Sequence, residues 1–284
     1  MGIGKVYKLL LTTKGKVMIS KDKIMNTLFY DIETTTRYKT YEEYKEAEPF
    51  MADDFEYRVQ LKWKKNELLD KTYSEIYHDE AMIYPEHGQV IAISWKIWDG
   101  KSFSGDTIGF KDWDDYATRG NTHADKDILI EFNKVMETIF GDENGSLGGY
   151  RIKYFDNPFL YKRMLINGIY PHKSLISVGK KPWDIPHLDL YDWWNGVGVN
   201  GMAGFGAACE VMGVKNPKEE EISGRQVCYR FWDDHNIQMI NEYCMRDVDS
   251  SIDFAINLSH DKLTSKYNKT LQEWNERKEN ENGI

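Results

Sequence analysis

Two carboxylates stand one residue apart at the end of an apolar and aromatic run, in the sequence Leu28-Phe29-Tyr30-Asp31-Ile32-Glu33-Thr34-Thr35. The run predicts a buried strand over residues 26–33. Side chains alternate between the two faces of a strand, so Asp31 and Glu33 would share one face. Two carboxylates this close repel each other unless a positive charge lies between them, and hard divalent cations take oxygen ligands. The pair therefore indicates a metal site, although alone it is equally compatible with a strand end and a polar turn.

Two later clusters carry residues of the same chemistry. Asp156 lies in Phe155-Asp156-Asn157-Pro158, where Pro158 suits the first turn of a helix. Alone, Asp156 could simply cap that helix. Tyr243 and Asp247 lie four residues apart in a helical stretch and would share one helix face. Each cluster is weak alone, and their joint presence indicates a site of several carboxylates.

The elements that must position these residues are predicted from periodicity and turn signals. The alternating run Gln89–Trp98 predicts a strand, and Asp99-Gly100 predicts a hairpin turn to a partner strand over Ser102–Phe110. Apolar residues at helical spacing predict a helix over 125–140 that Gly141 ends. The remaining expectations are a short strand over 146–153, a helix from Pro158 to about Gly168, a strand over 187–190, and helices over 203–213 and 236–258.

This order of elements predicts an α/β fold with a mixed β-sheet flanked by helices. We divide the chain into an N-terminal leader or hairpin (1–25), a main domain (26–258) and a charged C-terminal tail (259–284) that forms a surface helix or a frayed end. Residues 37–82 mix charges and aromatics at roughly helical spacing and predict a mostly helical insertion after the first core strand. The insertion is either a surface excursion or a clamp over the substrate.

Composition narrows the class of protein. The chain has 284 residues, of which 41% are apolar and 29% charged, and its net charge of −9 disfavours a protein that coats duplex nucleic acid. Three cysteines, none in C-x-x-C spacing, indicate neither a disulfide framework nor a zinc ribbon. No apolar run reaches the ~20 residues of a membrane span. We expect a cytoplasmic protein with reduced thiols and no membrane partner.

Taken in order, the three clusters resemble the motifs of the DEDD superfamily of 3′–5′ exonucleases, in its tyrosine-bearing (DEDDy) branch. Asp31-Ile32-Glu33-Thr34-Thr35 is similar to the first motif, Phe155-Asp156-Asn157-Pro158-Phe159-Leu160 to the second, and Tyr243-Cys244-Met245-Arg246-Asp247-Val248 to the third. The resemblance is greatest to the proofreading exonuclease domain of family B DNA polymerases and its stand-alone relatives, and it covers roughly residues 26–258. It implies an RNase H-like fold of the DnaQ-like type.

The resemblance also implies a mechanism, in which two Mg²⁺ or Mn²⁺ ions hydrolyse phosphodiester bonds at the 3′ ends of single-stranded DNA and release 5′-mononucleotides. Asp31, Glu33 and Asp247 would hold the first ion. Asp31 would bridge to the second, which Asp156 would reach directly or through water, with the ions ~3.5–4 Å apart. Tyr243 would orient the attacking water and would not act as a base, since the reference pKa of tyrosine is ~10.

Substrate contacts are expected from the residues around the carboxylates. Thr34 and Thr35 would approach the terminal nucleotide, and Phe155 either stacks on a base or belongs to the core. Relatives usually carry Asn five residues before the second-motif Asp, but Arg151 stands there, as a contact to the substrate end or as a surface residue. Further candidate phosphate contacts are Lys153, Lys162, Arg163, Lys180 and Lys181, although for any one of them a solvated charge is the simpler interpretation.

Several alternatives stay open at this stage. The pattern G-x-G-x-x-G at 196–201 does not follow a clean buried strand, so a dinucleotide site is disfavoured against a loop. The substrate could be RNA, because the motifs do not address the 2′-hydroxyl. The chain could also be a non-catalytic nucleic-acid-binding module, although all four carboxylates and the tyrosine are present. No polymerase fits beside this domain in 284 residues, so the enzyme would be free-standing or would work with replication or repair proteins in trans.

Overall fold

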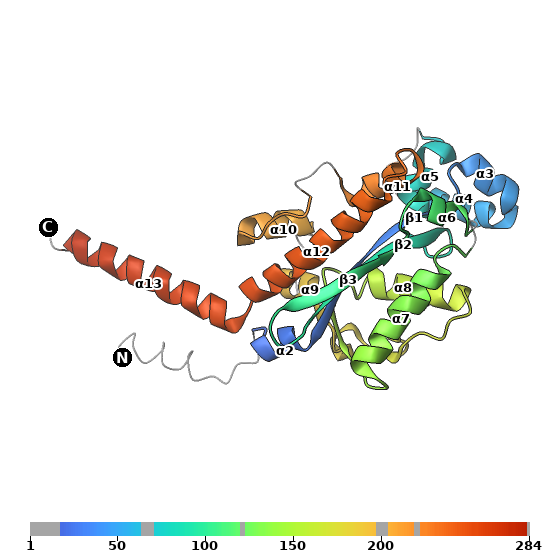
Figure 1. The fold of residues 1–284 in the computed structure, drawn as a ribbon. Helices are drawn as coiled ribbons and strands as arrows, with labels where there is room; N and C mark the ends of the chain where they lie inside the picture. The colour runs from blue at the N-terminus through green and yellow to red at the C-terminus, as the bar shows by residue number, and fades with distance from the viewer. Residues whose placement is uncertain (1–17, 64–70, 120–122, 197–203, 219–221, 283–284) are drawn as a thin grey trace.

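Five strands form one mixed sheet in the order β3-β2-β1-β4-β5 (Figure 1). The structure, a computed structural model, describes residues 18–63, 71–119, 123–196, 204–218 and 222–282. The strands are β1 (Thr27–Thr36), β2 (Gly88–Trp98), β3 (Phe103–Gly109), β4 (Ser146–Gly149) and β5 (Leu188–Asp189).

The pairing of the strands follows their connections. The Asp99–Gly100 turn joins β2 and β3 in an antiparallel hairpin, and Asp99 Oδ1 accepts the backbone N–H groups of Lys101 and Ser102. β1 also pairs antiparallel with β2, whereas β4 pairs parallel with β1 and β5 parallel with β4. These parallel neighbours are reached through helices, as parallel pairs require. The α/β mixed-sheet prediction is therefore confirmed.

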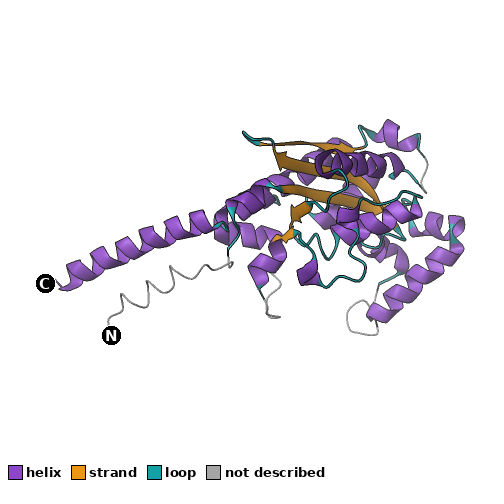
Figure 2. Cartoon of the chain, turned by 90° about the horizontal axis from the view of Figure 1, so that it is seen from below, coloured by secondary structure: helices purple, strands orange, loops and turns teal. Residues whose placement is uncertain are grey.

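Helices cover both faces of the sheet (Figures 1 and 2). On one face Tyr30 packs on Phe132 of α7, with ring centroids 5.3 Å apart. On the other, Phe29 joins a core cluster with Val248 and Ile252 of α12. The helices of the main body are α2 (Lys21–Met25), α6 (Trp113–Ala117), α7 (Lys126–Phe140), α8 (Asp156–Ile166), α9 (Leu190–Asn195), α10 (Phe205–Met212), α11 (Gly224–Trp232) and α12 (Ile237–Asn257), with the short 3₁₀ helices η1 (Lys173–Leu175) and η2 (Pro182–Asp184).

The insertion after β1 is helical and has its own aromatic core. It contains α3 (Tyr41–Ala47), α4 (Pro49–Trp63) and α5 (Tyr73–Ala81). The rings of Tyr44 and Tyr77 stack 5.4 Å apart inside it. Buried His87, at the start of β2, accepts or donates a 2.7 Å hydrogen bond at the Tyr44 hydroxyl and so ties this core to the sheet.

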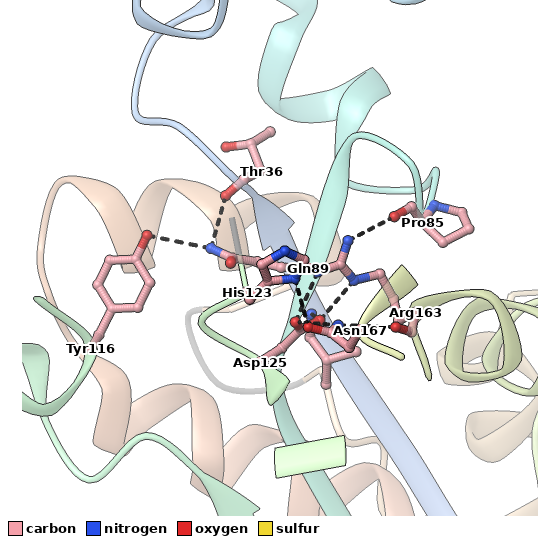
Figure 3. Close-up of polar contacts among 9 residues, drawn as sticks. Thr36, Pro85, Gln89, Tyr116, His123, Asp125, Arg163 and Asn167 are labelled. Carbon is pink, nitrogen blue, oxygen red and sulfur yellow. Dashed lines mark hydrogen bonds and ion pairs between the residues drawn. The ribbon is translucent and has the colours of Figure 1, made fainter. Parts of the chain in front are cut away.

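A buried ion pair fixes α8 against the sheet (Figure 3). Arg163 and Asp125 are wholly buried, and Arg163 Nε and Nη2 each donate to Asp125 at 2.8 Å. Asp125 also accepts from the Val90 backbone N–H and the Asn167 side chain, while Arg163 Nη1 donates to the carbonyl of Pro85. The cluster joins α7, α8 and β2, so it orients the helix that begins at Asp156.

The chain after α12 forms one long helix, α13 (His260–Asn282), that extends away from the body (Figure 1). At its base the His260 N–H donates to the Ile19 carbonyl at 3.0 Å. The tail is therefore a helix, the first of the two expected states. None of the helices in the described part of the chain combines the length and apolar character that a bilayer crossing requires.

Four details of the sequence prediction change. The strand predicted over 146–153 ends at Gly149, because Arg151 adopts a left-handed backbone with φ of 67°. The strand predicted over 187–190 has two residues, and Leu190 already begins α9. In the 1–25 segment, the described part contains α2 and no hairpin; residues 1–17 lie outside the described residues, as do 197–203 of the G-x-G-x-x-G pattern. Helix α11 was not predicted, although Ser223 and Gln226 form a capping box.

Candidate active site

Strand β1 brings Asp31 and Glu33 to the face of the sheet that α12 covers. The alternation places Ile32 on the other face, in the main core cluster, and a bulge follows Glu33. Glu33 is buried, with 7% of its surface exposed. The thiol of Cys244 lies behind Asp31 and contacts its carbonyl oxygen at 3.4 Å.

Helix α12 supplies Tyr243 and Asp247 from the same face, as their spacing predicts. Both are buried, and the Tyr243 hydroxyl is hydrogen-bonded to the Asp247 carboxylate. One carboxylate oxygen from each of Asp31, Glu33 and Asp247 can be chosen so that all three lie within 4.8 Å of one another. Strand β1 and helix α12 are distant in sequence, so the tertiary fold assembles this set.

Asp156 approaches the set from the start of α8. It is buried at 3% exposure, and its carboxylate accepts the backbone N–H of Ile32 on β1. This contact ties the second motif to the first. Burial, opposed by backbone hydrogen bonds and reinforced by the charges of Asp189 and Asp247, raises the pKa of Asp156 to about 7.

The charges of the clustered carboxylates favour binding of a cation. Burial, followed by repulsion from neighbouring carboxylates, raises the pKa of Asp31 and of Glu33 well above the ordinary range. Burial raises the pKa of Asp247 to about 6, against the charge of Lys218. Buried carboxylates whose charge the protein does not neutralise fit a divalent cation, which prefers oxygen ligands. The residues present therefore suit the metal that the sequence predicts.

Tyr243 is held in its neutral form. Burial and then the charges of Glu33 and Asp247 raise its pKa far above the usual tyrosine value. Its hydroxyl can donate a hydrogen bond and accept one, but it cannot serve as a general base near neutral pH.

The carboxylates open into a cleft of about 720 Å³. Thr34 and Phe155 line it, as expected. Thr35 does not, contrary to the sequence prediction: its side chain is wholly buried and its hydroxyl is 3.1 Å from the Cys228 thiol, so it supports β1 against α11. The lining residues are Asp31, Ile32, Glu33, Thr34, Met82, Ile83, Tyr150, Arg151, Tyr154, Phe155, Asp156, Gly204, Phe205, Lys218, Ser223, Gly224, Arg225, Tyr243, Asp247 and Ser251.

The loop from β4 to α8 presents Arg151 to this cleft. Its left-handed backbone is one that asparagine adopts more readily than arginine, which explains why Asn suits this position in the pattern. Asp189 stabilises the loop by accepting the backbone N–H groups of Arg151 and Lys153, both at 2.9 Å. The Arg151 guanidinium lies over the Tyr191 ring, 4.9 Å from its centroid.

Three residues of this region were not predicted as site residues. Lys218 and Arg225 are exposed cations that line the cleft. The charge of Lys218 partly offsets the rise in the pKa of Asp31. The two cations lie in irregular chain or at a helix start, where sequence gives no positional signal. Asp189 acts through the loop; its signal was the polar residue inside an apolar strand end, in His187-Leu188-Asp189-Leu190.

The other predicted phosphate contacts fall into three groups. Arg163 is excluded, because it is wholly buried in its pair with Asp125. Lys153 pairs with Asp192 at 3.1 Å and Lys162 with Glu86 at 3.0 Å. Lys180 and Lys181 are exposed, lie outside the cleft lining and have no ion pair in the described part of the chain.

The sequence of the chain matches a known protein family. A family model described as "Predicted 3′-5′ exonuclease related to the exonuclease domain of PolB" matches residues 88–252, more than half of the chain. The match includes Asp156, Tyr243 and Asp247, and Asp31 and Glu33 precede it. No curated protein matches the chain.

Among solved structures, the chain is similar to the family B DNA polymerase from the hyperthermophilic archaeon Pyrobaculum calidifontis, with 16% sequence identity and a TM-score of 0.49. The alignment covers 82% of this chain and 24% of the polymerase chain, so this chain corresponds to about a quarter of that protein.

Proposed function

Because the chain belongs to the family of predicted 3′–5′ exonucleases related to the exonuclease domain of PolB, we propose that it is a metal-dependent DEDDy exonuclease acting on 3′ ends of single-stranded DNA. The observation that carries the proposal is the convergence of four carboxylates, three of them buried and that of Asp31 partly exposed, with Tyr243 on one cleft. The products would be 5′-mononucleotides.

Asp31, Glu33 and Asp247 would hold one divalent ion, and Asp31 with Asp156 would hold the second. When bound, such ions lower the pKa of a water and stabilise the charge that develops on the leaving oxygen. The chain's own contribution is to hold four carboxylates together where they line the cleft. The Ile32 N–H on Asp156 restricts the rotation of that carboxylate, and the Cys244 thiol donates to the backbone carbonyl of Asp31.

The remaining residues would bind and orient the substrate. Tyr243, which donates its hydroxyl hydrogen to Asp247, would accept a hydrogen bond from the water in line with the scissile bond. Arg151, Lys218 and Arg225 would contact phosphate oxygens, because they are exposed cations that line the cleft. Tyr154 and Phe155 offer faces on which an unpaired base can stack. These sequence-independent contacts favour a single strand.

The test incubates 5′-labelled single-stranded DNA, duplex DNA and RNA with Mg²⁺, Mn²⁺ or EDTA. We expect a ladder that shortens the single-stranded DNA from its 3′ end, stops in EDTA and is absent for Asp247→Ala. Faster shortening of RNA would change the substrate class, and internal fragments would indicate an endonuclease. Tight binding with no cleavage under any metal would identify a non-catalytic module.

A further inference from the structure

The loop between α8 and β5 exposes a tryptophan among lysines. Trp183 is 74% exposed and Val178 73% exposed, and the Lys181 ammonium lies 5.4 Å from the centre of the Trp183 indole. Lys180 is exposed beside them, after a turn in which the Lys180 N–H donates to the Ser177 carbonyl. An indole this exposed gains nothing from core packing, so its large apolar face is available to a ligand.

The positive charges of this loop are not neutralised by carboxylates. Lys23 of α2 lies beside it, and its ammonium donates to neutral oxygens, the Ser146 hydroxyl at 2.8 Å and the Pro186 carbonyl. Lys180 and Lys181 have no ion pair in the described part of the chain. Asp184 is the one acidic residue within 171–187.

Electrostatic effects on a neighbouring histidine place these charges close together. Burial, countered by a hydrogen bond to Ser174 and reinforced by Lys153, Lys23 and Lys180, lowers the pKa of His187 to about 4. Burial and the charge of Lys153 likewise lower the pKa of Lys23. Lys153, Lys23 and Lys180 therefore lie close enough to His187, just before β5, to disfavour its charged form.

The lysines near His187 are connected to the cleft by the loop between β4 and α8. Lys153 belongs to the segment that presents Arg151 and Tyr154 to the cleft, and its N–H is bonded to Asp189, two residues after His187. The segment that carries the exposed lysines and Trp183 is therefore connected to the cleft-lining loop through Asp189.

We propose that Lys23, Lys180, Lys181 and Trp183, here called the Lys–Trp surface, bind single-stranded nucleic acid upstream of the 3′ end held in the cleft. The proposal rests on the proposed function. Lysines would contact phosphates, and Trp183 would stack on an unpaired base, the pairing of groups that single-strand binding uses. On a chain of net charge −9, an unpaired cationic patch is complementary to a polyanion.

An acidic peptide could also meet the lysines, but it offers no planar ring system for the exposed indole. Nucleic acid supplies both a planar base and a phosphate at each repeat. Chemical complementarity therefore favours the nucleic acid, and the peptide becomes an outcome of the test.

The test measures binding in EDTA, where cleavage does not interfere, by the anisotropy of labelled single strands of about 4 and about 20 nucleotides. Lys180→Ala/Lys181→Ala should weaken binding of the long strand and reduce the slope of log affinity against log salt by about 1.4, or about 0.7 for each phosphate contact. Trp183→Ala should weaken long-strand binding by about 5- to 100-fold. The short strand should be affected much less.

Matched controls lie on α13. Lys262→Ala/Lys266→Ala removes the same charge and Trp274→Ala the same ring from exposed positions, and neither should change the salt slope or the length dependence. Equal affinities for wild type and the Lys–Trp variants, or a loss confined to a glutamate-rich peptide, would overturn the proposal. Because the readout is binding, a failed ladder assay and a failed Lys–Trp surface give different results.

Discussion

The molecule buries carboxylates at two places and treats their charge in opposite ways. Asp125 lies under the start of α7 with two hydrogen bonds from the Arg163 guanidinium, one from a backbone N–H and one from Asn167 (Figure 3). In the cleft, Asp31, Glu33 and Asp247 lie together with no protein cation within ion-pair distance in the described residues, and Lys218 acts only from a distance.

This difference in charge compensation distinguishes a carboxylate that stabilises the fold from carboxylates that serve a function. A buried charge costs free energy unless a partner compensates it, so a site that serves stability contains its own cation. A site that leaves several carboxylates uncompensated is less stable than it could be, and a ligand must supply the missing charge. The comparison can be tested by changing one member at each place.

The largest effect is expected at the cleft. Asp31→Ala or Asp247→Ala should lower the rate of hydrolysis on the order of 10⁴-fold, because each removes a carboxylate that we propose as a metal ligand. The variants should stay folded and should not be less stable than wild type in EDTA, since a repulsive charge is gone. Rates and urea unfolding curves check both points, with Asp261→Ala on α13 as the control. A rate within a few-fold of wild type would exclude the residue from the site.

The opposite outcome is expected at the ion pair. Arg163→Met should lower the free energy of unfolding by about 3–5 kcal/mol, because it leaves Asp125 charged and buried without its partner. The double change Asp125→Leu/Arg163→Met should recover much of that loss. Arg230→Met, which breaks a more exposed pair with Asp234, should cost only about 0–1 kcal/mol. Equal costs for the two single variants would show that burial does not distinguish these pairs.

A smaller effect is expected for the tyrosine. Tyr243→Phe should slow hydrolysis roughly 10- to 100-fold, because a hydrogen bond to a charged partner is worth about 1.5–3 kcal/mol. Metal affinity, measured by calorimetry, should be nearly unchanged, because the four carboxylates remain. Tyr229→Phe, at an exposed position of α11, is the control. Unchanged kinetics would remove Tyr243 from the mechanism.

The smallest expected effect is a change of stability with pH. The pKa of Asp156 is raised to about 7, so the folded state binds a proton that the unfolded state has released above about pH 4. Stability from this group is therefore present at low pH and is lost as the pH rises toward 7. In EDTA, the stability of wild type relative to Asp156→Asn should fall by about 1.4 kcal/mol from about pH 5 to about pH 6.

Saturating Mg²⁺ is the control for that measurement. A bound cation keeps Asp156 ionised in the folded state, so the slope should vanish when the metal is present. A slope that persists in Mg²⁺ would mean that Asp156 does not face the ion.

Local signals predicted the elements that hold the carboxylates. Alternation placed Asp31 and Glu33 on one face, helical spacing placed Tyr243 beside Asp247, and Gly141 ended α7 where predicted. These features depend on residues close in sequence, for which periodicity is sufficient.

What could not be predicted depends on distant contacts. Whether Thr35 faces the cleft or the core is decided by Cys228 of α11, nearly two hundred residues away. The end of β4 depends on Asp189, which stabilises the left-handed backbone of Arg151. Lys218 reaches the cleft because irregular chain after α10 carries it there, and no pattern encodes that path.

The left-handed backbone at Arg151 has a consequence for engineering. An L-residue with a side chain gives up roughly 1–2 kcal/mol in that conformation, whereas glycine adopts it freely. Arg151→Gly should therefore raise the melting temperature and remove the guanidinium from the cleft in one step. A campaign that selects for thermostability alone would favour that change and lose the substrate contact proposed for Arg151, so position 151 should be held fixed whenever activity is the goal.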